Sequence, residues 1–397
     1  MIHYQFLIIG GGMAAAAAVR GIREVDAQSS IGLISEESDP PYDRPPLSKG
    51  LWKGGAIDGI WSELDNHGVT CYLDRAVAAI DPGNKQVTDT QGTVYTFDKL
   101  LVATGGTPRR LPFGDGQIMY YRTLTDYRRL RALADQHQRF AVIGGGFIAS
   151  EIAAALRMNG KEVVMILRDD GISKRLFPRD LADFVTTFYR EKGVEVLTGD
   201  AVVGLESHGG QLTLKTKNGR EVLADGVVAG IGIQPNIGLA REAGLAVEHG
   251  ILVDQYLRTS HPDIYAAGDV AEFLDHTLGG RRRVEHEDNA NTMGRLAGRA
   301  MAGEPAPYQH IPFFYSDLFE LGYEAVGDLD SRLEMVADWT EPYRKGVVYY
   351  LQAGRVRGVL LWNVWDQVEA ARHLLAEPGP FQRADLIGRL PRTDRKP

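Results

Sequence analysis

One arrangement of residues occurs twice in this chain, and it limits the fold more than any other feature. The stretches "FLIIGGGMAAAAAVRGIRE" at 6–24 and "FAVIGGGFIASEIAAALRMNG" at 140–160 both run from an apolar, strand-like segment through three glycines into an alanine-rich helical pattern. Both read GxGxxA. The positions that define the motif are Gly10, Gly12, Ala15, Gly144, Gly146 and Ala149. A repeated strand, glycine turn and helix predicts two βαβ units.

A turn of this kind is typical of sites that bind the pyrophosphate of a dinucleotide. The first glycine permits the tight turn, the second lets the phosphates approach the backbone, and the small third residue lets helix and strand pack closely. The phosphates then lie at the positive end of the helix dipole. Because each unit would hold one dinucleotide, we expect two, and the natural pair is FAD with a nicotinamide cofactor.

The end of the second strand in each unit should supply the residue that contacts the adenosine ribose. In the first unit "IGLISEE" ends in Glu36, whose carboxylate suits a ribose diol. In the second unit "EVVMILRDDG" leaves the choice open. Asp169 or Asp170 would favour NADH, because carboxylates repel a phosphate, whereas Arg168 could accept the 2′-phosphate of NADPH. We predict NADH with Asp169 as the ribose contact, and NADPH stays open.

Composition limits the partners and the compartment. The chain has 397 residues, of which 44% are hydrophobic and 24% charged, as in ordinary soluble proteins. Its net charge of -8 argues against a nucleic-acid partner, because phosphate contacts require a basic surplus. The start "MIHYQFLIIGGG" lacks the segments of a signal peptide, and no apolar run approaches the roughly 18 residues that span a bilayer. We therefore expect a cytoplasmic protein without a membrane span.

The single cysteine, Cys71, excludes an internal disulfide and a cysteine-ligated zinc site. The cluster around His286 is not arranged as a metal site either, because Glu285, Glu287 and Asp288 point different ways on any regular backbone. No metal site is predicted.

Three further stretches join a strand-like run to a glycine turn: "DKLLVATGGTPRRLP" at 98–112, "GVVAGIGIQPN" at 226–236 and "SHPDIYAAGDVAE" at 260–272. Their order resembles that of the two-dinucleotide flavoprotein reductases. The finer resemblance is to the branch of apoptosis-inducing factors and oxygenase-coupled ferredoxin reductases. The stretches that carry it are "PPYDRPPLSKGLW", "TGGTPR", "VEHEDNANTMGRLAGRAMAG", "FFYSDLFELGYEAVG" and "GVLLWNVWDQVEAARHLL".

The resemblance implies an α/β fold with two Rossmann-like dinucleotide-binding domains, for FAD and NAD, plus a small α+β C-terminal domain. The FAD-binding domain is then discontinuous, over residues 1–115 and 236–310. The NAD(P)H-binding domain covers 116–235, and the C-terminal domain covers 311–397. The tail "GRLPRTDRKP" is expected to fray.

The resemblance also implies which residues take part in catalysis. Lys49 would lie beside the flavin N5, and Glu151, two turns into the second dinucleotide helix, would be its partner carboxylate. A buried lysine without a partner tends to lose its charge, whereas a paired one can stabilise negative charge on reduced flavin. Glu285 and His286 would lie by the nicotinamide and the flavin.

The predicted cofactor contacts follow the same pattern. Arg44 would reach the FAD phosphates from the proline-rich turn, Arg109 would contact FAD, and Asp269 would accept a hydrogen bond from a ribityl hydroxyl. Tyr315 stands where the relatives usually carry tryptophan, and its smaller ring bears on how firmly a charge-transfer complex with NAD is held. The other predicted cofactor contacts are Val77, Thr104, Gly105, Ile148 and Gly232.

The predicted function is that of an FAD-dependent NAD(P)H oxidoreductase resembling the apoptosis-inducing factors. Hydride would pass from NADH to FAD, and electrons would then pass to an unidentified acceptor, for which oxygen and quinones are candidates. The alternative is a ferredoxin or rubredoxin reductase serving an oxygenase or cytochrome chain, with Arg281, Arg282 and Arg283 as the docking face for an acidic iron–sulfur carrier. A third hypothesis is a redox-sensed binding protein with little turnover. A homodimer is a further expectation.

Overall fold

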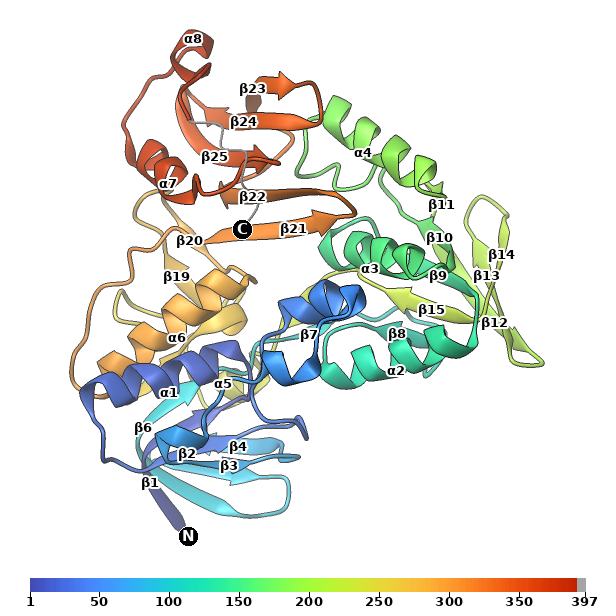
Figure 1. Cartoon of the computed structure of the whole chain (residues 1–397). Helices are drawn as coiled ribbons and strands as arrows, with labels where there is room; N and C mark the ends of the chain where they lie inside the picture. Colours follow the sequence, from blue (N-terminus) through green and yellow to red (C-terminus); the bar gives the residue numbers. More distant parts are fainter. Residues whose placement is uncertain (391–397) are drawn as a thin grey trace. The chain divides into compact units, whose positions relative to one another are not determined.

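The computed structural model describes residues 1–390, and Figure 1 labels their helices and strands. The chain divides into two compact units, each built from three separate segments. Unit 1 comprises Met1–Arg44, Ala56–Thr107 and Gln234–Pro312; unit 2 comprises Pro45–Gly55, Pro108–Ile233 and the chain from Phe313 onward. Most of the tail that we expect to fray, residues 391–397, lies outside the described residues. The domain limits at 115, 235 and 310 stay predictions.

The main sheet of unit 1 is parallel at one side and antiparallel at the other. Its strands follow the order β3-β2-β1-β6-β5-β4, and β18 also pairs with β6. The central strand β1 starts with exposed residues and ends in four buried ones, as expected where a parallel sheet is covered on both faces. The bounds are β1 Ile2–Ile9, β2 Ile31–Ile34, β3 Val69–Tyr72, β4 Val77–Asp81, β5 Gln86–Asp89, β6 Val94–Val102 and β18 Ile264–Ala266.

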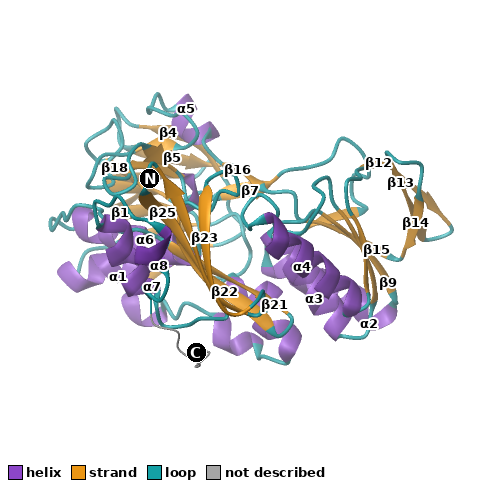
Figure 2. Cartoon of the chain, turned by 90° about the horizontal axis from the view of Figure 1, so that it is seen from above, coloured by secondary structure: helices purple, strands orange, loops and turns teal. Residues whose placement is uncertain are grey.

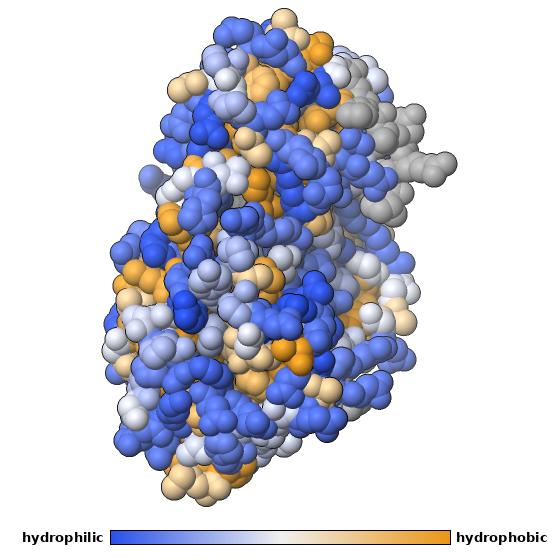
Figure 3. All heavy atoms as spheres, turned by 90° about the vertical axis from the view of Figure 1, so that its left-hand side faces the viewer, coloured by the Kyte–Doolittle hydropathy of each residue, from blue (hydrophilic) through white to orange (hydrophobic). Residues whose placement is uncertain are grey.

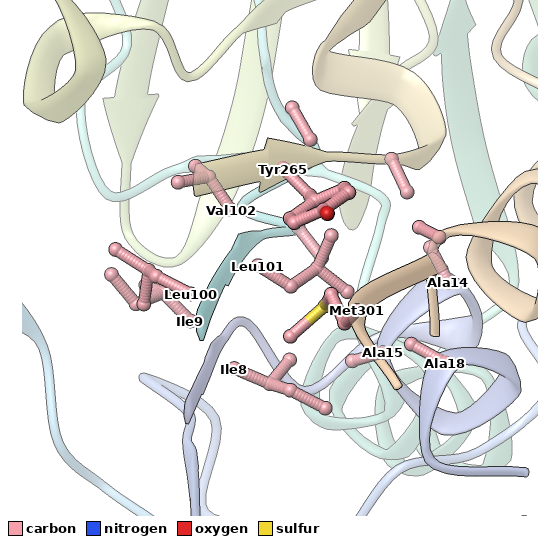
Figure 4. Close-up of a cluster of buried hydrophobic side chains, with 14 of the residues drawn as sticks. Ile8, Ile9, Ala14, Ala15, Ala18, Leu100, Leu101, Val102, Tyr265 and Met301 are labelled. Atoms are coloured by element: carbon pink, nitrogen blue, oxygen red, sulfur yellow. The ribbon is translucent and has the colours of Figure 1, made fainter. Parts of the chain in front are cut away.

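Two long helices, α1 (Met13–Val25) and α6 (Glu287–Met301), belong to the core of unit 1. Figure 4 shows this core, where side chains from β1 and β6 meet small side chains of α1. Ala15 and Ala18 are fully buried there. Alanine is the best helix former, and its small side chain lets the helix lie close to the sheet.

Glycines bring the backbones of α1 and α6, which lie side by side in Figures 1 and 2, into direct contact. At each of three contacts a Cβ atom added to the glycine would lie only 2.1–2.2 Å from a carbonyl oxygen of the other helix. Real Cβ atoms essentially never come so close, so these positions require glycine. The pairs are Gly21 with Arg295, Gly294 with Ala14 and Gly298 with Ala18.

Gly298→Ala should lower the free energy of unfolding by about 1–2 kcal/mol. The added methyl group forces the helices apart, at a typical cost of about 1–3 kcal/mol, and the better helix propensity of alanine offsets up to about 1 kcal/mol of it. Thermal unfolding measures the change. Gly238→Ala is the control, because it lies in α5 (Gly238–Glu242) with open space at its Cβ position. A Gly298→Ala protein as stable as the unmodified chain would contradict the close contact.

Smaller elements complete unit 1, and two of them, β7 and β16, each contain one residue that belongs to unit 2. Strands β17, β19 and β20 form a three-stranded sheet, and β7 pairs with β16. The bounds are β7 Gly106–Pro108, β16 Ile233–Pro235, β17 Ile251–Leu252, β19 Ala271–Leu274, β20 Arg281–Arg282, and the 3-10 turns η3 Ile57–Ile60, η4 Asp65–His67 and η5 Gly268–Val270.

Unit 2 contains a second parallel sheet, in the order β11-β10-β9-β15-β8, and an antiparallel sheet of β12, β13 and β14. Figure 2 shows α3 and the antiparallel sheet on opposite sides of β15. A core that includes Ala141, Ile143 and Leu214 joins the two sheets. The bounds are β8 Ile118–Tyr120, α2 Leu124–Gln136, β9 Arg139–Ile143, α3 Phe147–Met158, β10 Glu162–Ile166, α4 Arg179–Glu191, β11 Val194–Leu197, β12 Val202–His208, β13 Gln211–Thr216, β14 Glu221–Ala224 and β15 Gly226–Ala229.

The C-terminal part of unit 2 is an antiparallel sheet in the order β21-β22-β25-β24-β23, followed by two helices. Its two middle strands, β24 and β25, each contain a run of consecutive buried residues. The bounds are β21 Phe313–Leu318, β22 Leu321–Gly327, β23 Glu334–Glu341, β24 Lys345–Gln352, β25 Arg355–Trp362, α7 Val368–Ala376 and α8 Arg383–Leu386.

Two surface features bear on partners. Within residues 1–390, no helix combines the length and apolarity needed to cross a bilayer. The face drawn in Figure 3 is mostly hydrophilic, with apolar residues scattered over it in small groups. Scattered apolar residues are normal on protein surfaces and mark no binding site by themselves.

Candidate active site

The two glycine turns share one backbone geometry. Gly10 has φ +118° and Gly144 has φ +122°, a conformation that side-chain-bearing residues rarely adopt. A Cβ atom on Gly10 would lie 2.2 Å from the carbonyl oxygen of Ala103, and one on Gly144 would lie 2.3 Å from that of Gly230. Both positions therefore require glycine for the same two reasons.

Each turn leads directly into a helix. Gly12 and Gly146 are the N-cap residues of α1 and α3, with φ/ψ of −92°/−173° and −90°/−169°. No described side chain caps either helix, and neither first turn contains an acidic residue. The first N–H groups and the positive end of each helix dipole are thus left for an anion. Ala15 and Ala149, the third positions of the motif, are fully buried. This geometry fits a pyrophosphate in each unit.

In unit 1, Arg44 lies beside the first glycine turn. A Cβ atom on Gly12 would lie 3.9 Å from its Nη2. The guanidinium is held by the Glu37 carboxylate and donates to the Tyr42 hydroxyl, 3.2 Å from Nη1. Glu36, the predicted ribose contact, is exposed just beyond the end of β2. The structure thus gathers a fixed cation and an accessible carboxylate near one turn.

Asp269 also lies near the start of α1. It is part of the η5 turn, where a Cβ atom on Gly268 would lie 2.9 Å from the Cβ of Ala14. Arg283 links this turn to Glu285: its Nη1 donates to the Asp269 carbonyl oxygen at 2.9 Å, and its Nη2 lies 2.6 Å from Glu285 Oε1. The sequence pattern gave no sign of this role for Arg283.

The remaining predicted contacts of unit 1 occupy the ends of its elements. His286 is the N-cap residue of α6, and its carbonyl oxygen accepts from the Ala290 N–H at 3.0 Å. Thr104 follows β6, and its hydroxyl donates to the Asn236 carbonyl oxygen at 3.0 Å. The next residue, Gly105, has φ +61°. Val77 begins β4 and packs, half-buried, against the core of the unit.

In unit 2, Arg109 and Gly232 are neighbours. The Arg109 N–H donates to the Gly232 carbonyl oxygen at 2.9 Å, and its Nε donates to the Ile233 carbonyl oxygen at 3.1 Å. Ile148, the second residue of α3, is 37% exposed, which is unusual for a large apolar side chain beside a glycine turn. Asp169 lies beyond the end of β10.

Glu151 is the centre of a buried polar cluster in unit 2. It lies on α3, is only 3% exposed, and accepts three side-chain hydrogen bonds. Ser48 Oγ and Lys49 Nζ donate to Oε2 at 2.6 and 2.8 Å, and Ser316 Oγ donates to Oε1 at 2.6 Å. The Lys49 ammonium also lies 5.1 Å from the centre of the Tyr315 ring. Three distant parts of the sequence meet at this one carboxylate.

The proline-rich turn fixes the position of Lys49. Two 3-10 turns, η1 (Pro45–Ser48) and η2 (Gly50–Lys53), flank it. The prolines restrict φ, and the carbonyl oxygen of Leu47 accepts from Trp52 Nε1 at 2.9 Å and from the Tyr121 hydroxyl at 2.5 Å. The lysine side chain is only 14% exposed, so its position is set by the turn and by Glu151.

This cluster satisfies the requirements of a buried ion pair. Both carboxylate oxygens are bonded, which offsets the cost of removing the charge from water. Burial, together with the neighbouring Glu151 carboxylate, raises the pKa of Tyr189 and of Tyr323 well above the ordinary value, so both hydroxyls stay protonated. The pattern of the sequence did not reveal Ser48 and Ser316, although they adjoin the predicted Lys49 and Tyr315.

Glu151→Gln should lower the free energy of unfolding by about 3–5 kcal/mol, because it leaves the Lys49 ammonium buried without a compensating charge. Urea denaturation measures the loss. The double variant Lys49→Met/Glu151→Leu removes both charges and should recover most of the stability. If the double variant is less stable than Glu151→Gln, the ion pair is not the cause.

A second carboxyl group removed from solvent, that of Glu324, lies on β22 of the C-terminal sheet. It pairs in register with Tyr315, so the two side chains lie on the same face. Its Oε2 is buried and has no hydrogen-bond partner among the described residues. Burial, with the neighbouring Asp366 carboxylate, raises the pKa of Glu324 to about 7.

The raised pKa predicts a specific pH dependence. An unfolded glutamate titrates near about 4.3, so the folded state holds a proton that the unfolded chain has lost between that pH and about 7. Stability from this group is complete below pH 4.3 and is lost as the pH rises to about 7. Glu324→Gln imitates the protonated form. The Glu324→Gln variant should therefore be more stable than the unmodified chain at high pH. The difference in their free energies of unfolding should grow from near zero at pH 4.3 to about 1–2 kcal/mol at pH 8, after discounting for solvent screening. Urea unfolding of both proteins across this range measures it, and a difference that does not vary with pH would contradict the assignment.

Among residues 1–390, no group of three or more histidine, cysteine, aspartate or glutamate side chains is placed to hold a metal ion.

Known protein families match most of the chain. The family described as pyridine nucleotide-disulphide oxidoreductase matches residues 4–294. The chain belongs to this family. The C-terminal domain of the mitochondrion-associated apoptosis-inducing factor matches residues 297–342 and 338–377. For this pyridine nucleotide oxidoreductase, the predicted branch, the α/β fold and the C-terminal domain type are therefore confirmed.

Individual relatives cover nearly the whole oxidoreductase. It is 35% identical to apoptosis-inducing factor 1, mitochondrial, of Dictyostelium discoideum, over 94% of this chain and 78% of the relative. It is also 35% identical to the ferredoxin reductase subunit of 5,5'-dehydrodivanillate O-demethylase of Sphingobium sp., over 90% of this chain and 89% of the relative. The reductase in a crystal structure of the covalent putidaredoxin reductase–putidaredoxin complex matches with a TM-score of 0.88 at 28% identity, covering 95% and 94% of the two chains.

These findings confirm an FAD-dependent NAD(P)H oxidoreductase. They do not test the roles predicted for single residues, which stay predictions. The family's name includes a disulphide, but this chain cannot form an internal one. The turn at 45–55 offers Ser48 and Lys49, and the single cysteine, Cys71, is exposed on the edge strand β3 of unit 1. The chain therefore has no cysteine pair through which electrons could leave.

Proposed function

We propose that the chain takes hydride from a nicotinamide dinucleotide, NADH or NADPH, and passes the electrons through FAD to a separate acceptor. FAD, when bound, would accept the hydride and could then release electrons one at a time. The observation that carries the proposal is the buried pair of Lys49 and Glu151, whose Nζ and Oε2 lie 2.8 Å apart. A fixed, desolvated ammonium of this kind is suited to stabilise negative charge that develops beside it.

The predicted roles divide between binding and catalysis. In unit 1, Gly10, Gly12 and Arg44 would hold the FAD phosphates, and Glu36 and Asp269 would bind its ribose and ribityl hydroxyls. In unit 2, Gly144 and Gly146 would hold the pyrophosphate of the nicotinamide cofactor. Lys49 would face the flavin edge, as the resemblance implies, and Glu151 with its two serine donors holds that lysine in place.

The acceptor is proposed to be oxygen or a quinone, as in the apoptosis-inducing-factor-like interpretation. The arginines nominated to dock an iron–sulfur carrier support this choice, because two of them are engaged within unit 1. Arg282 pairs with Asp275 at 3.0 Å and Arg283 with Glu285 at 2.6 Å, and their side chains are only 19% and 17% exposed. Such paired cations contribute little to an electrostatic docking face.

A ferredoxin-type acceptor is the second candidate. It is favoured by the two relatives whose names contain ferredoxin reductase and putidaredoxin reductase. A cytoplasmic location and a homodimer, both expected from the sequence, are also part of the proposal.

Anaerobic reduction followed by defined acceptors tests the proposal. NADH should bleach the flavin of the purified protein, and admission of oxygen or a quinone should restore it without a protein carrier. Reoxidation only on addition of a ferredoxin would favour the second candidate. A protein that takes up no FAD would overturn both.

Lys49→Ala should slow the reduction of the flavin by NADH by about a hundredfold, the typical effect of removing one positioned electrostatic donor. Stopped-flow absorbance measures the rate. Lys53→Ala is the matched control, because Lys53 lies in the same segment, pairs with Asp317 and is 42% exposed. Equal rates for the two variants would remove Lys49 from the site.

A further inference from the structure

The two nucleotide-binding units can be aligned residue by residue from their own hydrogen bonds. The first glycine donates to the last residue of the second strand, through Gly10 N to Ile34 O at 2.8 Å and Gly144 N to Ile166 O at 2.9 Å. The residue after that strand donates to the end of the third strand, through Ser35 N to Tyr72 O at 2.9 Å and Leu167 N to Leu197 O at 3.0 Å. Ser35 is therefore equivalent to Leu167.

The middle glycine of each turn supports the same alignment. A Cβ atom on Gly11 would lie 2.3 Å from Ser35 Oγ, and one on Gly145 would lie 2.8 Å from Leu167 Cδ1. Counting on by one residue makes Arg168 the equivalent of Glu36. Both are exposed, and the residue that follows each of them is half-buried. The position that carries a carboxylate for the ribose in unit 1 thus carries a guanidinium in unit 2.

Two carboxylates near Arg168, those of Asp169 and Asp170, would repel a phosphate, but each is paired with a cation. Asp169, like its equivalent Glu37, pairs with a downstream arginine: Arg175 Nε and Nη2 lie 3.1 and 3.4 Å from its two carboxylate oxygens. Asp170 pairs with Lys174. Within residues 1–390, the Arg168 side chain has neither a hydrogen bond nor an ion pair. The segment 168–175 therefore holds one more cation than anion, and the unmatched cation is Arg168.

We propose that Arg168 binds the 2′-phosphate of NADPH, so that unit 2 binds NADPH more tightly than NADH. This rests on the proposed function, in which unit 2 holds the nicotinamide cofactor. A guanidinium can bind a phosphate through two parallel N–H···O bonds, and an exposed arginine gives up little hydration to do so. NADH still binds through the turn at Gly144 and Gly146 but gains nothing from Arg168.

Two redox-inactive probes that differ only in the 2′-phosphate test the assignment, 2′,5′-ADP and 5′-AMP. Binding to the FAD-loaded protein is measured by calorimetry, so that no turnover is needed. We expect 2′,5′-ADP to bind more tightly than 5′-AMP. Arg168→Glu, which installs the residue type of unit 1, should weaken 2′,5′-ADP by about ten- to a hundredfold, as expected for one lost charged hydrogen-bonded contact, and leave 5′-AMP nearly unchanged.

Arg355→Glu controls for net charge, because Arg355 is an exposed arginine in the hairpin between β24 and β25. It should leave both affinities unchanged. Equal affinity of the two probes, or equal weakening by both substitutions, would overturn the role of Arg168 while leaving the nucleotide site intact. If neither probe binds, the nucleotide site in unit 2 fails, and the proposed function fails with it.

Discussion

A single buried carboxylate organises unit 2. Glu151 joins α3, the proline-rich turn at 45–55 and the first strand of the C-terminal sheet, because each supplies one of its donors. An ionised group so deeply buried is tolerated only when its oxygens are bonded. The segment 45–55 accordingly belongs to unit 2, although its neighbours on both sides belong to unit 1. The position of the Lys49 ammonium, 5.1 Å from the centre of the Tyr315 ring, depends on this arrangement.

The molecule uses one nucleotide-binding device twice and varies it at one place. The first and third glycines of the two turns have nearly equal dihedral angles, and the first glycine of each lies against a main-chain carbonyl oxygen. The residue proposed to select the ribose is not part of that backbone geometry. It can therefore be a glutamate in one unit and an arginine in the other without disturbing either turn.

The sequence alone predicts the local features well and the long-range ones poorly. The two turns are visible because positive φ and close backbone contacts leave glycine as the only choice. The pairing of Lys49 with Glu151 was predicted from a family resemblance, since no local pattern connects two residues so far apart. Ser48 and Ser316 were missed, because a serine that donates to a buried carboxylate looks in sequence like any other serine.

The arginine run at 281–283 shows how pairing in the fold bears on a charge pattern read from the sequence. Three consecutive cations suggest a docking face, but Arg282 and Arg283 pair with the nearby carboxylates of Asp275 and Glu285, and Arg281 donates to two main-chain carbonyl oxygens. The sequence also leaves the end of β10 open, and the proposed choice among Arg168, Asp169 and Asp170 uses that end as its reference point. Hydrogen bonds fix that end to the residue, and spacing along a sequence does not.

The contact between α1 and α6 has a consequence for how this protein can change over time. When two side chains clash, a smaller residue at the partner position can relieve the strain. Here the atoms that face Gly21, Gly294 and Gly298 are main-chain carbonyl oxygens, which every amino acid possesses. No second substitution at the facing positions can therefore make room for a side chain. If one of these glycines is replaced, the close contact returns only when the glycine itself returns, and otherwise a whole helix has to move.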